Sequence, residues 1–186
     1  MLDSKKMQAQ LNGPASVFVS NGQVYIADML NHRVRKVLPN GQIVTICGTG
    51  QAGYNGDNQP ATQAQLDGPA CVFVSQSDQV YITEGSGHRI RKIDQNGIIT
   101  TIAGTGSAGY NGDDQLAVNA QLNYPRGLFV TEDEEVLIAD MDNSSIRLIE
   151  MEGFQQLLGL NLMVTLEMDN WQQSLLSINK CIQVQE

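Results

Sequence analysis

The chain has 186 residues, 41% of them hydrophobic, which is enough apolar material for a globular domain with a core of its own. Eleven Lys and Arg residues stand against twenty Asp and Glu residues, and the formal charge of −9 argues against a nucleic-acid partner or an anionic membrane surface. The sequence shows neither a signal peptide nor an apolar stretch long enough to span a membrane, so we expect a soluble protein.

Along the chain, one pattern occurs three times with a period of 56 residues. Each copy joins a segment like AQLNGPASVFVS to one like VYIAD and one like HRVRKV. These segments occupy 9–20, 24–28 and 32–37, then 64–75, 80–84 and 88–93, then 120–131, 136–140 and 144–149. A fourth run, at 43–50 and 99–106, has no third copy.

The runs within each copy predict strands. They are rich in Val, Ile, Phe, Tyr and Thr and are separated by turn signals such as Asn40-Gly41 and Asn96-Gly97. Because the runs are nearly continuous rather than alternating, we expect them to be buried on both sheet faces. Four antiparallel strands per repeat with both faces covered predict an all-β fold, a partial β-propeller of about three four-stranded blades; a solenoid is the less favoured alternative.

The predicted organisation is a propeller region, residues 1–150, followed by an irregular C-terminal segment, residues 151–186, that lies outside the repeat. The three repeats fall at about 9–63, 64–119 and 120–150. The apolar spacing of the C-terminal segment fits a strand or a helix equally well. Three blades leave two apolar faces open, so we expect self-association that completes the propeller. The other explanation is a truncated fragment of a longer propeller, without independent function.

A glycine-rich loop, GTGQAGYNGD at 48–57, returns as GTGSAGYNGD at 104–113. In an antiparallel meander, the loop between the second and third strands and the connection to the next blade leave from the same sheet edge. We therefore expect this loop to share a face with Asp28 and His32. Its glycines suit positive φ, its tyrosines can pack over the gap between blades, and Asp57 can cap the next segment, where Pro60 begins a helical turn. A phosphate cradle is disfavoured because no basic residue follows the loop closely.

The chained motifs GTGxAGYNGD, AxxAQL, a proline-led strand, VYIAD, NHR and IRKV resemble the NHL-repeat family in its long-repeat form, over about 9–150. The resemblance implies a propeller, usually six-bladed, that acts mostly as a binding platform. It also implies an enzymatic alternative, because a minority of related propellers are metal-dependent lyases or lactonases. Some members bind RNA through a basic face, which the acidity of this chain disfavours.

Metal sites are the alternative interpretation of the polar loop residues. Oxygen ligands for calcium could come from Asn55, Asp57 and Asn58, with Asp113 and Asp114 in the second loop. His32 and His88, each four residues after a strand carboxylate, Asp28 or Glu84, could bind zinc together with these carboxylates or form general acid-base pairs with them. We favour a structural role, a turn hydrogen bond to the strand carboxylate, since the third copy has Ser144 in place of the histidine. No cofactor, metal ligand or catalytic residue is therefore assigned.

Two further groups of residues are expected to have structural roles. The basic residues of the third strands, Arg35 and Arg91 among them, alternate sides, so some should pair with carboxylates of an adjoining strand or extend outward to solvent. Cys47 and Cys71 replace small residues of the other repeats, so we expect them to be core residues.

The sequence thus favours a non-enzymatic binding module that presents its loop-bearing face to a protein partner. The candidate binding residues are Asp28, His32, Arg33, Tyr54, Asn55, Asp57, Glu84, His88, Arg89, Tyr110, Asn111 and Asp113.

Overall fold

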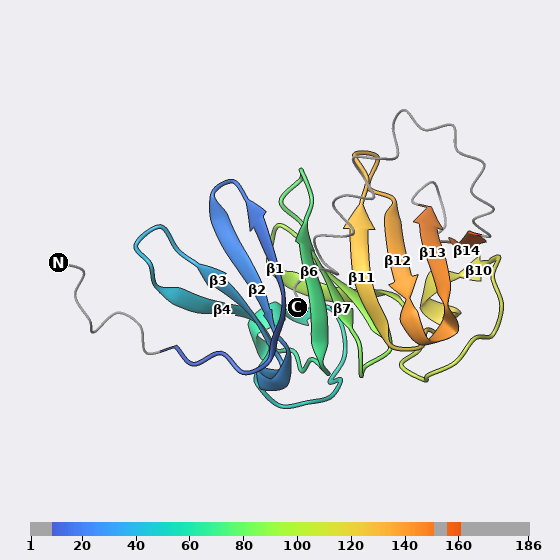
Figure 1. The fold of residues 1–186 in the computed structure, drawn as a ribbon, viewed down its shortest axis with the longest axis horizontal. Helices are drawn as coiled ribbons and strands as arrows, with labels where there is room; N and C mark the ends of the chain where they lie inside the picture. Colours follow the sequence, from blue (N-terminus) through green and yellow to red (C-terminus); the bar gives the residue numbers. More distant parts are fainter. Residues whose placement is uncertain (1–8, 151–155, 161–186) are drawn as a thin grey trace.

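A computed structural model describes residues 9–150 and 156–160. Three antiparallel sheets follow one another along the chain, from the blue strands to the orange ones in Figure 1. The sheet of the first blade has the order β1-β2-β3-β4. Its strands are β1 (Pro14–Ser20), β2 (Gln23–Asp28), β3 (Arg33–Val37) and β4 (Ile43–Cys47). The predicted all-β architecture of about three propeller blades is confirmed.

The second and third blades have the same meander with one short strand added. The second blade has the order β5-β9-β8-β7-β6 and the third has the order β10-β14-β13-β12-β11. Their strands are β5 (Gln59–Pro60), β6 (Pro69–Val74), β7 (Val80–Glu84), β8 (Arg89–Ile93) and β9 (Ile98–Ala103), then β10 (Gln115–Leu116), β11 (Pro125–Val130), β12 (Val136–Asp140), β13 (Ser145–Glu150) and β14 (Gln156–Leu160). The added strands β5 and β10 belong to the connection from the preceding blade, so they join each blade to the next through backbone hydrogen bonds.

Short 3-10 helices occupy turns after the second strands and the connections between blades. They are η1 (Met29–Asn31), η2 (Ala61–Gln63), η3 (Ala117–Asn119) and η4 (Met141–Asn143). The predicted helical turn after Pro60 is η2. In the part of the chain that the structure describes, no helix has both the length and the apolar character to cross a membrane.

Strand β14 corrects one prediction. The sequence placed all of 151–186 outside the repeat, but Gln156–Leu160 pairs antiparallel with β13 and supplies the fourth strand of the third blade. Ladder hydrogen bonds use only backbone groups, so a segment without the repeat's side-chain pattern can still fill this edge. The remainder of the predicted irregular segment lies outside the described residues.

The core consists of two apolar layers, each between two blades. One layer packs Tyr25, Ala27, Val34 and Cys47 of the first blade against Val72, Val74, Val80, Ile82, Ile93 and Ile99 of the second. The other layer packs Cys71, Phe73, Tyr81 and Ile90 of the second blade against Leu128, Val130, Val136, Ile138 and Ile149 of the third. Strands β6 and β7 are buried at every position, as their continuous apolar runs predict. The prediction that Cys47 and Cys71 are core residues is confirmed.

Candidate functional site

The loops after the second strands and the connections between blades lie at the same edge of the sheets. Arg33, at the end of the first such loop, donates from Nη2 to the Thr49 carbonyl oxygen at 2.8 Å. Leu30 donates its backbone N–H to the Asn12 carbonyl oxygen at 3.1 Å. We call this surface the loop-bearing face; it comprises residues 9–13, 29–32, 48–58, 64–68, 85–88, 104–114, 120–124 and 141–144. The intervening residues 59–63 and 115–119 run toward the opposite edge, where Pro60 pairs with Ile98 and Leu116 with Gln156. Strand direction alone predicts this arrangement.

The glycine-rich loop is held by its own asparagine. The Oδ1 atom of Asn55 accepts the Gln65 backbone N–H at 2.8 Å, and its Nδ2 donates to the Gln63 carbonyl oxygen at 3.0 Å. Asn111 makes the same two contacts in the second loop, at 2.7 and 3.0 Å. These two hydrogen bonds of one side chain fix the loop against the turn that follows it. The loop is therefore a preformed connector rather than an open cradle.

Each loop tyrosine lies over an arginine of the next blade. The ring of Tyr54 is 4.2 Å from Cζ of Arg89 and 5.0 Å from Cζ of Arg91. Its hydroxyl donates to Asp57 at 3.1 Å. Tyr110 repeats the arrangement with Asp113, at 2.8 Å, and with the guanidinium of the third blade. The two rings are 42% and 55% exposed, so each packs over the gap between blades, as predicted, and still presents one side to solvent.

Buried arginines join the loop carboxylates to the blades. Arg91 lies 2.9 Å from Asp57 of the preceding connection and 3.4 Å from Glu84 of its own blade. Arg147 makes the corresponding contacts, 2.7 Å to Asp113 and 3.1 Å to Asp140. The predicted pairing of third-strand arginines with strand carboxylates is confirmed. The predicted cap is wrong: η2 has no side-chain cap hydrogen bond, because the Asp57 carboxylate turns to the arginine instead.

The strand carboxylates are not accessible. Asp28 and Glu84 are fully buried, although the sequence placed both among the residues available to a ligand. Asp28 accepts the Asn12 backbone N–H at 2.8 Å, and Glu84 accepts that of Asp67 at 3.0 Å. Burial, only partly offset by Arg91, raises the pKa of Glu84 to about 7. These carboxylates bind the backbone just before the first strand of their own blade and do not face a ligand.

The two histidines connect neighbouring blades. Nδ1 of His32 accepts the Gly68 backbone N–H at 3.2 Å, and Nδ1 of His88 accepts that of Tyr124 at 3.1 Å. The expected hydrogen bond between the turn and the strand carboxylate is present in the first and third blades, but the histidine does not make it. Asn31 donates to Asp28 in that place, at 2.9 Å. Both histidines have a left-handed backbone conformation, with φ of 51° for His32 and 52° for His88, and this conformation directs each imidazole toward the following blade.

The donor atoms proposed for metals are engaged in these contacts. The Asp57 carboxylate forms an ion pair with Arg91, and the histidine Nδ1 atoms accept hydrogen bonds from backbone N–H groups. Within the described ranges, no group of three His, Cys, Asp or Glu side chains lies close enough to hold a metal ion.

Exposed apolar side chains gather on the loop-bearing face. Of the exposed large apolar residues in the described chain, Leu11, Leu30, Tyr54, Tyr110 and Met141 belong to it; Val17 and Val19 lie on β1, and Leu116 and Val118 lie on β10 and η3 of the connection into the third blade. The loops at the opposite edge are polar and acidic, with Asp78, Glu132, Asp133, Glu134 and Glu135. The sequence analysis did not include Leu30 and Met141 among the candidate binding residues. Each is an apolar residue in a polar turn that follows a strand carboxylate, and that pattern could have indicated an exposed apolar side chain.

Comparison with known proteins adds a family and several relatives. Residues 40–111 match the family model described as the teneurin NHL domain. The chloroplastic protein SUPPRESSOR OF QUENCHING 1 of Arabidopsis thaliana is 37% identical over 98 residues, which cover 52% of this chain and 9% of that protein. The chain thus spans less than a tenth of the length of the first curated relatives that it matches.

Two solved structures resemble the three blades. A structural genomics protein of unknown function from Bacteroides thetaiotaomicron has a TM-score of 0.60 and 26% identity, over 69% of this chain and 32% of that one. Virginiamycin B lyase from Staphylococcus aureus has a TM-score of 0.51 and 18% identity, over 81% of this chain and 41% of that one. The likeness to the lyase concerns the fold alone.

Proposed function

Because this chain belongs to the NHL-repeat β-propeller family, we propose that its blades form a binding module and that the loop-bearing face contacts a protein partner. The distribution of exposed apolar side chains carries the proposal. Most of them lie on the loop-bearing face, whereas the turns between the first and second strands at the opposite edge are polar and acidic. An exposed apolar patch bordered by polar groups is typical of a protein-interaction surface.

The chemistry of this face suits protein recognition. Tyrosine, methionine and arginine are enriched at protein interfaces, and Tyr54, Tyr110 and Met141 are exposed here. The tyrosine rings are already held by arginines and by hydrogen bonds to aspartates. A side chain that is ordered before binding loses little conformational entropy when a partner arrives. The loop thus offers rigid aromatic anchors at two successive blade junctions.

The enzymatic alternative, a metal-dependent lyase or lactonase, has less support in the described residues. Such an enzyme needs histidines and carboxylates from several blades directed at a common point. Here the strand carboxylates are buried against arginines, and the histidines are turned toward neighbouring blades.

Site-specific photo-crosslinking tests the proposal. A photoreactive side chain is placed at position 30 or 141 on the loop-bearing face, and at position 42 in a loop of the opposite edge as the control. We expect the first two positions to crosslink the same protein in cell extract and position 42 not to do so. The affinity of the purified pair is then measured for Leu30→Glu with Met141→Glu, and for Gln42→Glu with Gln95→Glu, which adds the same charge.

The face variant should weaken binding by roughly tenfold or more, because charge at an apolar contact is left desolvated. The control variant should bind as the wild type does. Crosslinks that concentrate at position 42, or equal affinity for both variants, would overturn the proposal.

A further inference from the structure

The outer edge of the first blade lacks a strand that the other two blades have. Within the described residues, β4 has a strand neighbour on one side only, whereas β9 is paired with β5 and β14 with β10. Ile43 of β4 is half-buried, and its repeat counterpart Ile99 in β9 is fully buried. The first blade therefore has an open sheet edge, which can pair with another extended segment.

In the second blade, a single segment covers this edge and binds the side chains beside it. The Asp57 carboxylate accepts a hydrogen bond from Nη2 of Arg91 at 2.9 Å and one from the Thr101 hydroxyl at 3.0 Å. The next residue, Asn58, donates its backbone N–H to the Ile99 carbonyl oxygen at 2.8 Å, and the chain continues as β5. The carboxylate and the strand thus come from adjacent positions of one segment.

The same segment also contributes an aromatic ring. Tyr54, three residues before Asp57, lies over the guanidinium groups of Arg89 and Arg91. Residues 54–60 therefore contact the second blade through a ring, a carboxylate and a short strand, in that order along the chain.

The first blade keeps the three side chains that receive this segment. They are Arg33, Arg35 and Thr45, the repeat counterparts of Arg89, Arg91 and Thr101. The register agrees, since Arg35 lies opposite Thr45 and their counterparts lie opposite each other in the second blade. In the third blade, Gly159 lies opposite Arg147, so that blade has no such threonine. We call Arg33, Arg35, Ile43 and Thr45 the first-blade edge.

The central arginine of the first-blade edge has fewer partners than its counterpart. In the part of the chain that the structure describes, Arg35 has one carboxylate beside it, that of Asp28 at 3.5 Å, where Arg91 has two. The side chain of Arg35 is 12% exposed, and that of Arg91 is 0% exposed. A guanidinium group has five N–H donors, so Arg35 can bind a second carboxylate.

We propose that the first-blade edge binds, in trans, an extended segment of a partner protein in which an aromatic residue precedes an aspartate by three positions. The ring stacks on Arg33, the carboxylate accepts hydrogen bonds from Arg35 and Thr45, and the residues that follow pair with β4. Backbone pairing supplies affinity for an added strand, and the side-chain contacts supply specificity. The test below does not depend on the binding role proposed for the loop-bearing face.

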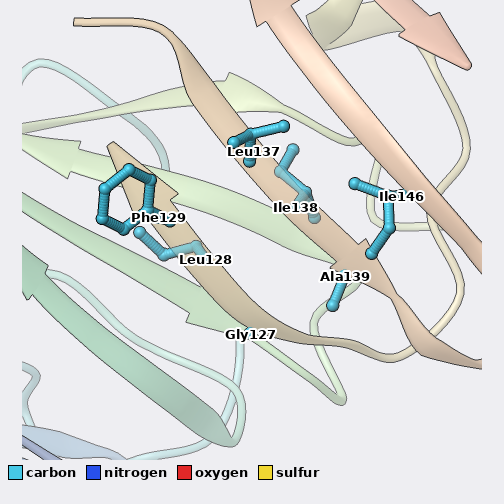
Figure 2. Close-up of a pocket in the computed structure, with 7 residues that line it drawn as sticks. All are labelled: Gly127, Leu128, Phe129, Leu137, Ile138, Ala139 and Ile146. Carbon is cyan, nitrogen blue, oxygen red and sulfur yellow. The ribbon is translucent and has the colours of Figure 1, made fainter. Parts of the chain in front are cut away.

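The pocket of the third blade has a different chemistry. Figure 2 shows that its lining is apolar, with Leu128, Phe129 and Ile138 among the side chains. It therefore offers no donor to a carboxylate, and an acidic segment should select the first-blade edge instead.

A peptide with the sequence of residues 53–63, GYNGDNQPATQ, is the probe, because the second blade already binds this segment within the chain. A fluorescent label at its N-terminus reports binding to the full chain by anisotropy. We expect saturable binding, weakened roughly tenfold or more when the peptide carries Asp57→Asn. Tyr54→Leu in the peptide should weaken binding as well. Substitutions in the peptide leave the protein unchanged, so a loss of binding cannot arise from unfolding.

Variants of the full chain test the other side of the contact. Arg35→Met and Thr45→Val should each weaken peptide binding. Lys36→Met is the matched control, because it removes a positive charge from the same strand but not from the first-blade edge, and it should bind as the wild type does. Equal affinity for the wild-type and Asp57→Asn peptides, or an equal loss with Lys36→Met and Arg35→Met, would indicate general charge attraction and overturn the proposal.

Hydrogen exchange locates the bound peptide. In the chain alone, residues 41–45 should exchange faster than residues 97–101, whose edge β5 covers, and the peptide should slow exchange at 41–45. Equal protection of the two ranges without peptide would assign the edge to another segment of the same chain or to a second copy, and would overturn the proposal. Absence of peptide binding would overturn it as well.

Discussion

Arg91 of the second blade and Asp57 of the connection from the first blade form an ion pair, with 2.9 Å between Nη2 and Oδ1. The guanidinium is fully buried, and the aspartate side chain is 24% exposed. On its other side Arg91 lies beside Glu84 of its own blade. One buried cation therefore holds two carboxylates that come from two different blades.

Replacing this arginine should destabilise the chain more than replacing its first-blade counterpart. Arg91→Met leaves Glu84 buried without a cation and releases Asp57, and we expect a loss of about 3 kcal/mol in the free energy of unfolding. Arg35→Met should cost less, since in the described residues only Asp28 lies beside that guanidinium. Urea unfolding of both variants measures the difference. Equal unfolding midpoints would show that the connection to the preceding blade contributes nothing.

The raised pKa of Glu84 gives the stability a pH dependence with a definite sign. The pKa of this carboxyl is about 7 in the folded chain, mainly because it is buried, against an ordinary value of 4.5. Between these values the folded chain binds more protons than the unfolded chain. The contribution of Glu84 is therefore fully present below pH 4.5 and is lost as the pH rises through 7.

Glu84→Gln isolates that contribution, because glutamine stays uncharged at every pH. The unfolding free energy of the wild type should fall relative to that of the variant by up to about 1.4 kcal/mol per pH unit across this interval. Chemical denaturation at several pH values measures the slope, and thermal unfolding of Glu84→Gln alone shows that the variant folds. Parallel curves for the two proteins would contradict a raised pKa.

His88 should contribute to stability through the next blade rather than through its own turn. His88→Ala removes the acceptor for the Tyr124 backbone N–H and should cost about 1 kcal/mol more than Ser144→Ala. Ser144 is the matched control because it has the same left-handed conformation, φ of 53° against 52°, so both variants lose a residue at equal backbone strain. Denaturant unfolding compares the two. If the alanine variants lose the same free energy, the contact between blades is not stabilising.

Much of the fold could be predicted because its determinants are local or periodic. The strands, the hairpin turns and the period follow from side-chain pattern and from Asn-Gly pairs such as Asn40-Gly41. The common face of the loops follows from strand direction. Strand β14 could not be predicted, because it fills the edge of β13 with backbone groups and its sequence carries no repeat pattern.

The sequence predicts where the site residues lie, but not which partners they bind or whether they are exposed. Sequence puts Asp28 and His32 on the face that carries the glycine-rich loop; the His32 carbonyl oxygen lies next to Gly48, and Asp28 lies against Asn12. Their partners come from segments that only blade packing brings near, as with His32 and Gly68, thirty-six positions apart. Whether a carboxylate faces solvent or a buried arginine is decided by that packing, so a pattern within one repeat cannot reveal it.

Two glycines with similar backbone angles should respond differently to alanine. Gly104 has a φ of +92°, and a Cβ atom there would collide with the His88 carbonyl oxygen and lie 2.9 Å from Cα of Arg89. Gly97 has a φ of +77° with nothing within 4 Å of its Cβ position. Both substitutions pay about 1–2 kcal/mol for a left-handed conformation, and Gly104→Ala adds about 1–3 kcal/mol of steric cost.

The additional destabilisation by Gly104→Ala should also be local, because the collision pushes the connection after β9 away from the loop before β8. Hydrogen exchange should show faster opening of the backbone N–H groups of residues 104 and 105 in Gly104→Ala than in Gly97→Ala, since these two groups donate to the Ala117 and Ala120 carbonyl oxygens directly beside the collision. Equal destabilisation by both alanines would show that the close approach of the two loops is absent in solution. A larger loss confined to the junction would show that this close approach holds the connection after β9 against the second blade.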